Sequence, residues 1–182
     1  MARRPLTGVL LVGGASTRFG SPKALARIGG ETLAGRAWRV LGEACDERLA
    51  LGKAGELALP FAVLDDGVDV RAPIAGVVGA LREAAHDVAV VLPVDCPHVT
   101  AAALRTLGER CRDAAVTPDG PLPGAWARSA LPVLERRLHE RRLALVDAYE
   151  ELEVAMVALD RTLVADADTP EELARLLASS PV

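Results

Sequence analysis

The sequence has few cysteines and very few aromatic residues, and both shortages narrow the class of protein. The 182 residues include three cysteines, Cys45, Cys96 and Cys111. An odd number without C-x-x-C spacing indicates neither a disulfide framework nor a zinc site, so we expect buried thiols in a reducing compartment. Aromatic residues make up 3% of the chain and hydrophobic residues 51%. An aliphatic core of this kind is typical of a buried parallel sheet covered by helices.

The chain also lacks an excess of positive charge and any long hydrophobic run. Its formal net charge is −4, so no overall basic field would recruit nucleic acid. No stretch approaches the roughly 20 apolar residues that span a bilayer. The apolar run after Arg3 and Arg4 stops at Gly13, so it is too short for the core and cleavage site of a signal peptide. We therefore expect a cytoplasmic protein with neither nucleic acid nor membrane as a partner.

Strand and helix patterns alternate along the chain. Strands are expected at 9–12, 48–51, 61–64, 88–92, 114–117 and 154–159, with a short extended piece at 24–28 and a loop at 118–124. Helices are expected at 33–44, 74–85, 101–111, 130–143, 145–152 and 171–178, the first capped by Thr32 and the third by Thr100. This order predicts a single α/β domain over residues 1–182, a three-layer α/β/α sandwich with a mostly parallel sheet.

A glycine-rich loop with two cations follows the first expected strand. The apolar run Val9–Val12 is succeeded by Gly13 and Gly14, and then by Arg18 and Lys23. Glycines let a backbone approach a ligand closely, and exposed amides together with fixed positive charges favour an anion such as a triphosphate. The loop matches neither the P-loop nor the dinucleotide fingerprint G-x-G-x-x-G. An ordinary strand–loop connection would explain the glycines but not the cations.

Aspartates occur at two later places in the chain where a ligand could bind. Asp95 comes just after the expected strand 88–92, at the sheet edge where α/β proteins bind ligands. One or two carboxylates with phosphate oxygens suffice for Mg²⁺, although Asp95 is equally explained as a turn or helix-capping residue. Asp166 and Asp168 precede the last expected helix, where Asp168 or Thr169 would also serve as an N-cap.

These motifs together resemble a known family. The loop follows the pattern G-G-x-S-x-R-x-G-x-x-K, residues 92–97 an apolar strand followed by D-x-P, and residues 166–173 the pattern N-x-N-T-P-E-D-L with aspartates in place of asparagines. Such patterns mark nucleotidyltransferases, and the chain is most similar to the molybdenum cofactor guanylyltransferase family and its cytidylyltransferase relatives. The resemblance implies the nucleotide-diphospho-sugar transferase fold, which is GT-A-like and Rossmann-like.

The resemblance also implies roles for individual residues. It implies catalytic roles for Arg18, Lys23 and Asp95, and a Mg²⁺ ion on Asp95 with Asp168, rather than Asp166, as the second ligand. Nucleotide binding is implied for Leu11, Val12, Gly13, Gly14, Ser16, Arg18, Lys23, Asp69 and Asp95. Arg128, with Trp126, is a further candidate for an acceptor pocket.

The implied activity is the Mg²⁺-dependent transfer of GMP from GTP to molybdenum-bearing molybdopterin, which forms the guanine dinucleotide cofactor and releases pyrophosphate. A phosphate monoester acceptor is already anionic at neutral pH, so the reaction needs alignment and charge neutralisation rather than a general base. Three alternatives stay open: a relative that uses CTP or another phosphorylated acceptor, a nucleotide-binding regulatory module without catalysis, and a structural adaptor. No motif indicates an oligomeric state.

Overall fold

A seven-stranded, mostly parallel sheet forms the centre of the computed structural model, which describes residues 3–12, 22–53, 57–65, 67, 69–70 and 72–178. The strands follow the order β5-β4-β1-β6-β8-β7-β9 across the sheet. Their bounds are Thr7–Leu11 for β1, Glu47–Gly52 for β4, Leu64–Asp65 for β5, Val88–Pro93 for β6, Ala114–Thr117 for β7, Gly120–Ala127 for β8 and Val154–Met156 for β9. Strand β1 pairs in parallel with both β4 and β6, and β8 is antiparallel to both its neighbours.

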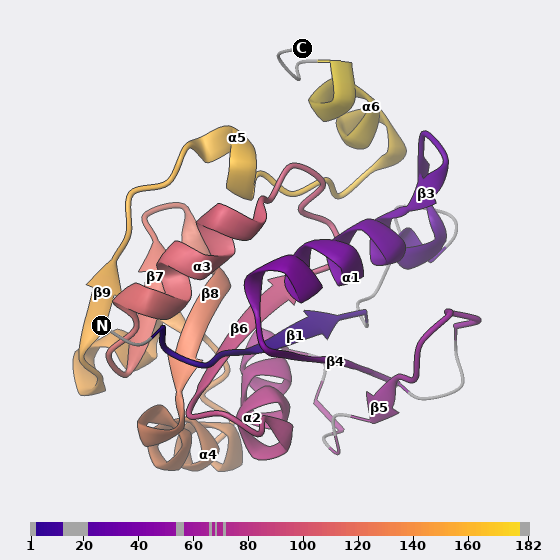
Figure 1. The fold of residues 1–182 in the computed structure, drawn as a ribbon. Helices are drawn as coiled ribbons and strands as arrows, with labels where there is room; N and C mark the ends of the chain where they lie inside the picture. Colours follow the sequence, from indigo (N-terminus) through magenta and orange to yellow (C-terminus); the bar gives the residue numbers. More distant parts are fainter. Residues whose placement is uncertain are drawn as a thin grey trace.

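Helices cover both faces of this sheet (Figure 1). The helices are α1 (Leu33–Ala44), α2 (Pro73–Glu83), α3 (Ala101–Arg110), α4 (Leu131–His139), α5 (Arg161–Val164) and α6 (Pro170–Ala178), with 3-10 turns η1 (Lys23–Leu25), η2 (Arg128–Ala130) and η3 (Val146–Glu151). Residues of α1 and α3 share one apolar cluster with the sheet, and residues of α2 and α4 share the other. A small hairpin, β2 (Arg27–Ile28) with β3 (Glu31–Thr32), precedes α1. The predicted three-layer α/β/α sandwich is confirmed.

Strand β6 shows why the sequence pattern was informative at the centre of the sheet. All residues from 88 to 92 are fully buried. Neighbouring residues point to opposite faces, so Val90 packs in the cluster with α1 and α3 while Val91 packs with α2 and α4. A strand covered on both faces reads as a continuous apolar run. The expected helix caps are also present, because Thr32 Oγ1 accepts from Gly35 N and Thr100 Oγ1 accepts from Ala103 N.

The structure differs from the sequence prediction around β8. Residues 118–124 were expected to be a loop because they are rich in proline and glycine, yet β8 begins at Gly120. Only its second half, Gly124–Ala127, pairs with β6. Pro121 and Pro123 fall where the register with β7 shifts, so their missing N–H groups interrupt no regular ladder. Tertiary pairing of the second half therefore overrides the local turn composition.

Several smaller elements also differ from expectation. The segment expected as a strand at 61–64 contributes only the two-residue β5, and residues 145–152 form the 3-10 turn η3 rather than an α-helix. The last expected strand ends at Met156, and the short helix α5 follows where none was expected. All of these elements are short, and β5 and β9 are the edge strands of the sheet, so few apolar positions mark their period.

Replacing Gly124 by alanine is expected to destabilise the fold by about 1–3 kcal/mol, because the close-packed β8 has no room for a side chain. An added Cβ would lie 2.3 Å from the carbonyl oxygen of Pro121 and 3.3 Å from that of Ala115, and backbone atoms yield less than side-chain ends. Denaturant unfolding measures the change. The matched control is Gly30→Ala, whose Cβ would meet nothing within 4 Å. Equal stabilities for the two variants would contradict the packing described for β8.

The three cysteines are buried and free, as expected. Burial raises the pKa of Cys45 and that of Cys111 to about 12, so both thiols are protonated at neutral pH. Within the described ranges, no helix has the length and apolar character needed to cross a membrane.

Candidate active site

Three charged side chains that are far apart in the sequence meet at the carboxyl edge of the sheet. Asp95 follows β6, Lys23 begins η1, and Asp168 precedes α6. Lys23 Nζ donates to Asp95 Oδ2 at 3.0 Å and to Asp168 Oδ1 at 2.8 Å. These contacts span 72 and 145 positions of the chain. The sequence prediction that the first loop and the residue after β6 face one site is thus supported by the geometry of Lys23 and Asp95.

The ammonium of Lys23 is a positive charge on a largely buried side chain. Its side chain is 12% exposed, whereas that of Asp95 is 21% and that of Asp168 54% exposed. Burial acts to lower the pKa of Lys23, but the hydrogen bonds and negative charges of Asp168 and Asp95 outweigh it and leave the pKa above its ordinary value. Lys23 therefore remains protonated at neutral pH.

Asp166 lies with Asp95 and Asp168 in this site. From the sequence, Asp168 rather than Asp166 was expected as the second metal ligand. One carboxylate oxygen from each of Asp95, Asp166 and Asp168 lies within 4.8 Å of the others. Hard oxygen donors from a few carboxylates are what Mg²⁺ and Mn²⁺ prefer. The three carboxylates also carry more negative charge than one ammonium neutralises. This donor set fits a divalent cation.

Backbone contacts hold the loop after β6 against the segment before α6. The amide of Ala167 donates to the carbonyl of Asp95 at 3.1 Å. On the other side of the loop, Arg36 Nε of α1 donates to the carbonyl of Pro97 at 2.6 Å. A ring nitrogen of His98 lies 2.9 Å from the carbonyl oxygen of Leu176 in α6. The two acidic segments are therefore held together by the main-chain hydrogen bond between Ala167 and Asp95, and the His98 side chain adds a contact with α6.

Two neighbouring residues have separate roles at the start of α6: Thr169 caps the helix, and Asp168 contacts Lys23. Thr169 Oγ1 accepts from Glu172 N at 3.1 Å, and Glu172 Oε2 accepts from the amides of Asp168 and Thr169. This reciprocal pattern is a capping box at the start of α6. Because Thr169 serves as the cap, the carboxylate of Asp168 is directed to Lys23 instead.

The end of β1 leads into the predicted phosphate loop. Leu11 accepts through its carbonyl from Val94 N at 3.2 Å, and Val12 N donates to the carbonyl of Leu51 at 2.9 Å. The Val12 amide is thus already paired within the sheet edge. Helix α2 begins close by, since a Cβ on Gly76 would lie 2.8 Å from Leu11 Cδ1. This close approach explains why a residue without a side chain occupies position 76.

Other predicted nucleotide-binding residues are placed differently. Asp69 is exposed in the segment before α2, and it makes no hydrogen bond or ion pair with any other residue that the structure describes. The predicted residues Gly13, Gly14, Ser16 and Arg18 lie outside the described residues.

The structure contradicts the interpretation of Trp126 and Arg128 as an acceptor pocket. Trp126 is fully buried in the core under α2 and α4. Arg128 donates to the carbonyls of Leu81 and Ala84, at 3.3 and 2.6 Å, and so binds the C-terminal end of α2. Because β8 runs antiparallel to β6, its end returns to the sheet edge opposite Asp95.

Sequence reasoning missed the supporting role of Arg36. It lies on the amphipathic helix α1, whose buried face is made by apolar residues, so nothing in the local pattern distinguishes Arg36 from a solvated arginine. Only the path of the loop after β6 brings the Pro97 carbonyl to it.

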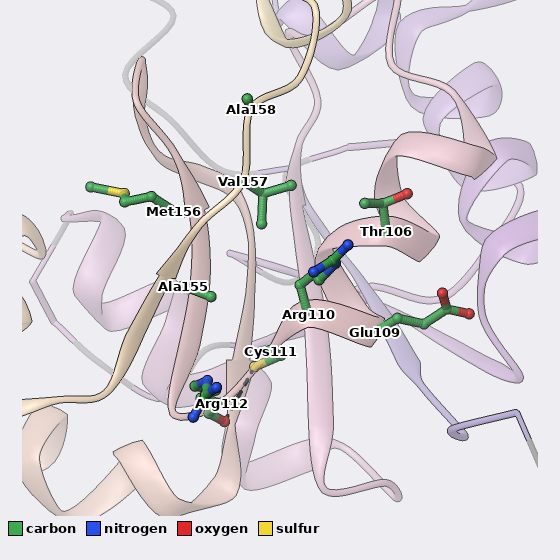
Figure 2. A pocket seen from close by; sticks show the side chains of 9 residues that line it. All are labelled: Thr106, Glu109, Arg110, Cys111, Arg112, Ala155, Met156, Val157 and Ala158. Carbon is green, nitrogen blue, oxygen red and sulfur yellow. Dashed lines mark hydrogen bonds between the residues drawn. The ribbon is translucent and has the colours of Figure 1, made fainter. Parts of the chain in front are cut away.

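A hollow of about 650 Å³ lies elsewhere, between the end of α3 and β9 (Figure 2). Its lining includes Arg110, Cys111 and Met156, and none of the carboxylates grouped around Lys23. Arg112 at its rim is paired with Glu153, and the Cys111 thiol has a pKa of about 12. This hollow offers no activated nucleophile or acid–base pair.

The chain is similar to known proteins over most of its length. Residues 8–156 match the family model described as MobA-like NTP transferase domain. A protein of Opitutus terrae named "Probable molybdenum cofactor guanylyltransferase" is 37% identical over 92% of this chain and 92% of its own length. The molybdenum cofactor guanylyltransferase of Desulfosudis oleivorans is 28% identical over 90% of this chain and 86% of its own. The crystal structure of molybdopterin-guanine dinucleotide biosynthesis protein A from Archaeoglobus fulgidus has a TM-score of 0.79 at 24% identity, covering 94% of this chain and 97% of that one. That likeness confirms the predicted nucleotide-diphospho-sugar transferase fold.

Proposed function

The chain belongs to the family of MobA-like NTP transferase domains, and on this premise we propose that it transfers GMP from GTP to molybdenum-bearing molybdopterin, forming the guanine dinucleotide cofactor and releasing pyrophosphate. Relatives named for this activity align with about nine-tenths of the chain. The observation that carries the proposal is the convergence of Lys23 with Asp95 and Asp168 at the end of β6. It supplies a positive charge for phosphates and carboxylates for a divalent cation in one place.

The reaction exchanges one phosphorus–oxygen bond for another. An oxygen of the acceptor's terminal phosphate monoester bonds to the α-phosphorus of GTP, and the bond from that phosphorus to the oxygen bridging to the β-phosphorus breaks. Pyrophosphate leaves with that oxygen. The attacking oxygen is already anionic, so no proton has to be removed. The protein's task is to align the two phosphates and stabilise the charge that moves onto pyrophosphate.

Residues of the chain are assigned to these tasks. Lys23 neutralises charge on the triphosphate, together with Arg18 and the amides of Gly13 and Gly14 in the loop after β1. Leu11, Val12 and Ser16 border the nucleotide, and Asp69 contacts it from the segment before α2. These assignments rest on the motif in the sequence and on where β1 ends beside Asp95.

Asp95 and Asp168 would hold Mg²⁺, with Asp166 beside them. When bound there, the ion supplies electrostatic stabilisation of phosphate oxygens during in-line displacement. The surrounding chain keeps the two acidic segments together through the contact between Ala167 and Asp95. We place the protein in the reducing cytoplasm, in keeping with its buried, free cysteines.

A screen of the four ribonucleoside triphosphates against candidate acceptors tests this function. With Mg²⁺ and molybdenum-bearing molybdopterin, we expect pyrophosphate release from GTP, and little from ATP, CTP or UTP. The control omits the acceptor and should give no pyrophosphate. Release with CTP instead of GTP would favour the cytidylyltransferase alternative. Nucleotide binding without pyrophosphate release under any pairing would favour a regulatory module and contradict the proposed activity.

A further inference from the structure

The Lys23 ammonium binds two of the three carboxylates that would hold the proposed metal ion. Asp95 Oδ2 and Asp168 Oδ1 each accept from Lys23 Nζ, at 3.0 and 2.8 Å. These are full-strength, charge-assisted hydrogen bonds rather than long-range attraction. With a side chain only 12% exposed, Lys23 is screened little by water. The single positive charge of the ammonium is therefore shared between two of the three grouped carboxylates.

A divalent cation and this ammonium compete for the negative charge of these two aspartates. Each carboxylate has about four lone-pair sites and the ammonium takes one oxygen of each, so the competition is electrostatic rather than steric. Two positive charges held a few ångströms apart in a half-buried site would also repel each other strongly. Asp166 differs, because no described residue makes a hydrogen bond or ion pair with it. A divalent cation at Asp95 and Asp168 is therefore bound more tightly once Lys23 has moved away.

We propose that Lys23 is an exchangeable internal cation, which holds Asp95 and Asp168 until a triphosphate draws its ammonium away and thereby opens both carboxylates to the divalent metal. This inference rests on the proposed function and deepens it. Phosphate oxygens offer Lys23 new acceptors of higher charge, so its transfer is favourable only when nucleotide is present. By linkage, nucleotide must then strengthen metal binding as much as metal strengthens nucleotide binding.

Removing the ammonium tests the exchange in the absence of nucleotide. We expect Lys23→Gln and Lys23→Met to bind Mn²⁺ alone about tenfold more tightly than the unmodified chain, a typical coupling between two sites. Titration with Mn²⁺, followed by the electron paramagnetic resonance signal of the free ion, measures the affinity. Arg82→Met is the matched control, since it removes one ion-paired positive charge from α2, where Arg82 binds Glu135. Affinity equal to or weaker than that of the unmodified chain in both Lys23 variants would overturn the proposal.

The unmodified chain provides a second, direct measurement. It contains two lysines, Lys23 and Lys53, so ¹³C-lysine labelling gives two side-chain signals that the Lys23→Gln variant assigns. We expect Mg²⁺ alone to leave the Lys23 signal in place, and Mg²⁺ with a GTP analogue carrying an α,β-methylene bridge to shift it. A Lys23 signal that stays unchanged with both ligands, or that already shifts to the same position with Mg²⁺ alone, would overturn the proposal.

These readouts separate the exchange from the reaction. If pyrophosphate is released from GTP and acceptor while Lys23 keeps its signal and Mn²⁺ affinities are equal, the exchange is wrong and the proposed function stands. If the Lys23 signal and the Mn²⁺ affinities change as expected, but no combination of triphosphate and acceptor releases pyrophosphate, the exchange stands and the proposed function is wrong.

Discussion

Replacing Asp95 by asparagine is expected to lower the rate of pyrophosphate release from GTP and molybdopterin by about 1000-fold, because metal stabilisation of phosphate charge is worth several kcal/mol. Asparagine keeps the size of the side chain and one oxygen that can accept from Lys23. It removes the negative charge that would bind Mg²⁺. The effect should therefore fall on turnover rather than on the fold, and a steady-state assay with saturating GTP measures it.

Asp87 provides the matched control for Asp95. It comes just before β6, so the two aspartates lie at opposite ends of the same strand. The side chain of Asp87 is 90% exposed, and its contact with Arg128 is long, at 3.8 Å. We expect Asp87→Asn to keep the rate of the unmodified chain. If a folded Asp95→Asn protein kept that rate as well, Asp95 would not hold the metal, and the assignment of the carboxyl edge as the reaction site would be wrong.

The parts of the fold that the sequence predicted are those where local and tertiary signals agree. Strand β6 is a continuous run of Val, Ala and Leu because both of its faces are covered. Helix α1 has a threonine cap and an apolar face at helical spacing, and its predicted bounds, Leu33–Ala44, are those observed. For the same reason Asp95 was predictable, since it directly follows the most recognisable strand.

Other residues could not be placed from the sequence, because distant segments set their surroundings. Arg128 looked like a ligand for an anion because β8 was not recognised, and its antiparallel direction decides at which sheet edge Arg128 lies. Asp166 and Asp168 are separated by one residue, so sequence alone gave no physical reason to favour either. The contact of Lys23 with Asp168 and the grouping of Asp166 with the others depend on how the segment before α6 crosses the sheet edge.

Helix α4 contains a buried arginine that the sequence pattern did not predict. The leucines at 131, 134 and 138 are spaced for one buried face of the helix, and Leu134 is fully buried. Arg137 is fully buried as well, although it follows Glu135 and Arg136 in the sequence. Its Nη1 donates to Glu151 Oε1 at 2.7 Å, and its Nη2 lies 3.6 Å from Asp147 Oδ2. The turn η3, unremarkable in sequence, is what makes a buried arginine tolerable here.

Replacing Glu151 by glutamine is accordingly expected to lower the melting temperature by about 5–10 °C, because a buried charge that loses its partner is costly and Glu151 is the closer of the two partners of Arg137. The hydrogen bond from Arg137 lowers the pKa of Glu151, against a smaller opposing effect of burial. The carboxylate's contribution is therefore present above the ordinary pKa of glutamate and is lost as the pH falls through the lowered value. Thermal unfolding at neutral and acidic pH measures both effects.

Glu150 serves as the control for Glu151, since it is exposed on the same turn. We expect Glu150→Gln to change the melting temperature by no more than about 1–2 °C. The difference in melting temperature between the unmodified chain and Glu151→Gln should be largest at neutral pH. It should disappear in acid, where neither glutamate nor glutamine at position 151 is charged. A gap that is small at neutral pH, or that persists in acid, would mean that Arg137 is stabilised by its packing and by Asp147 rather than by the charge of Glu151.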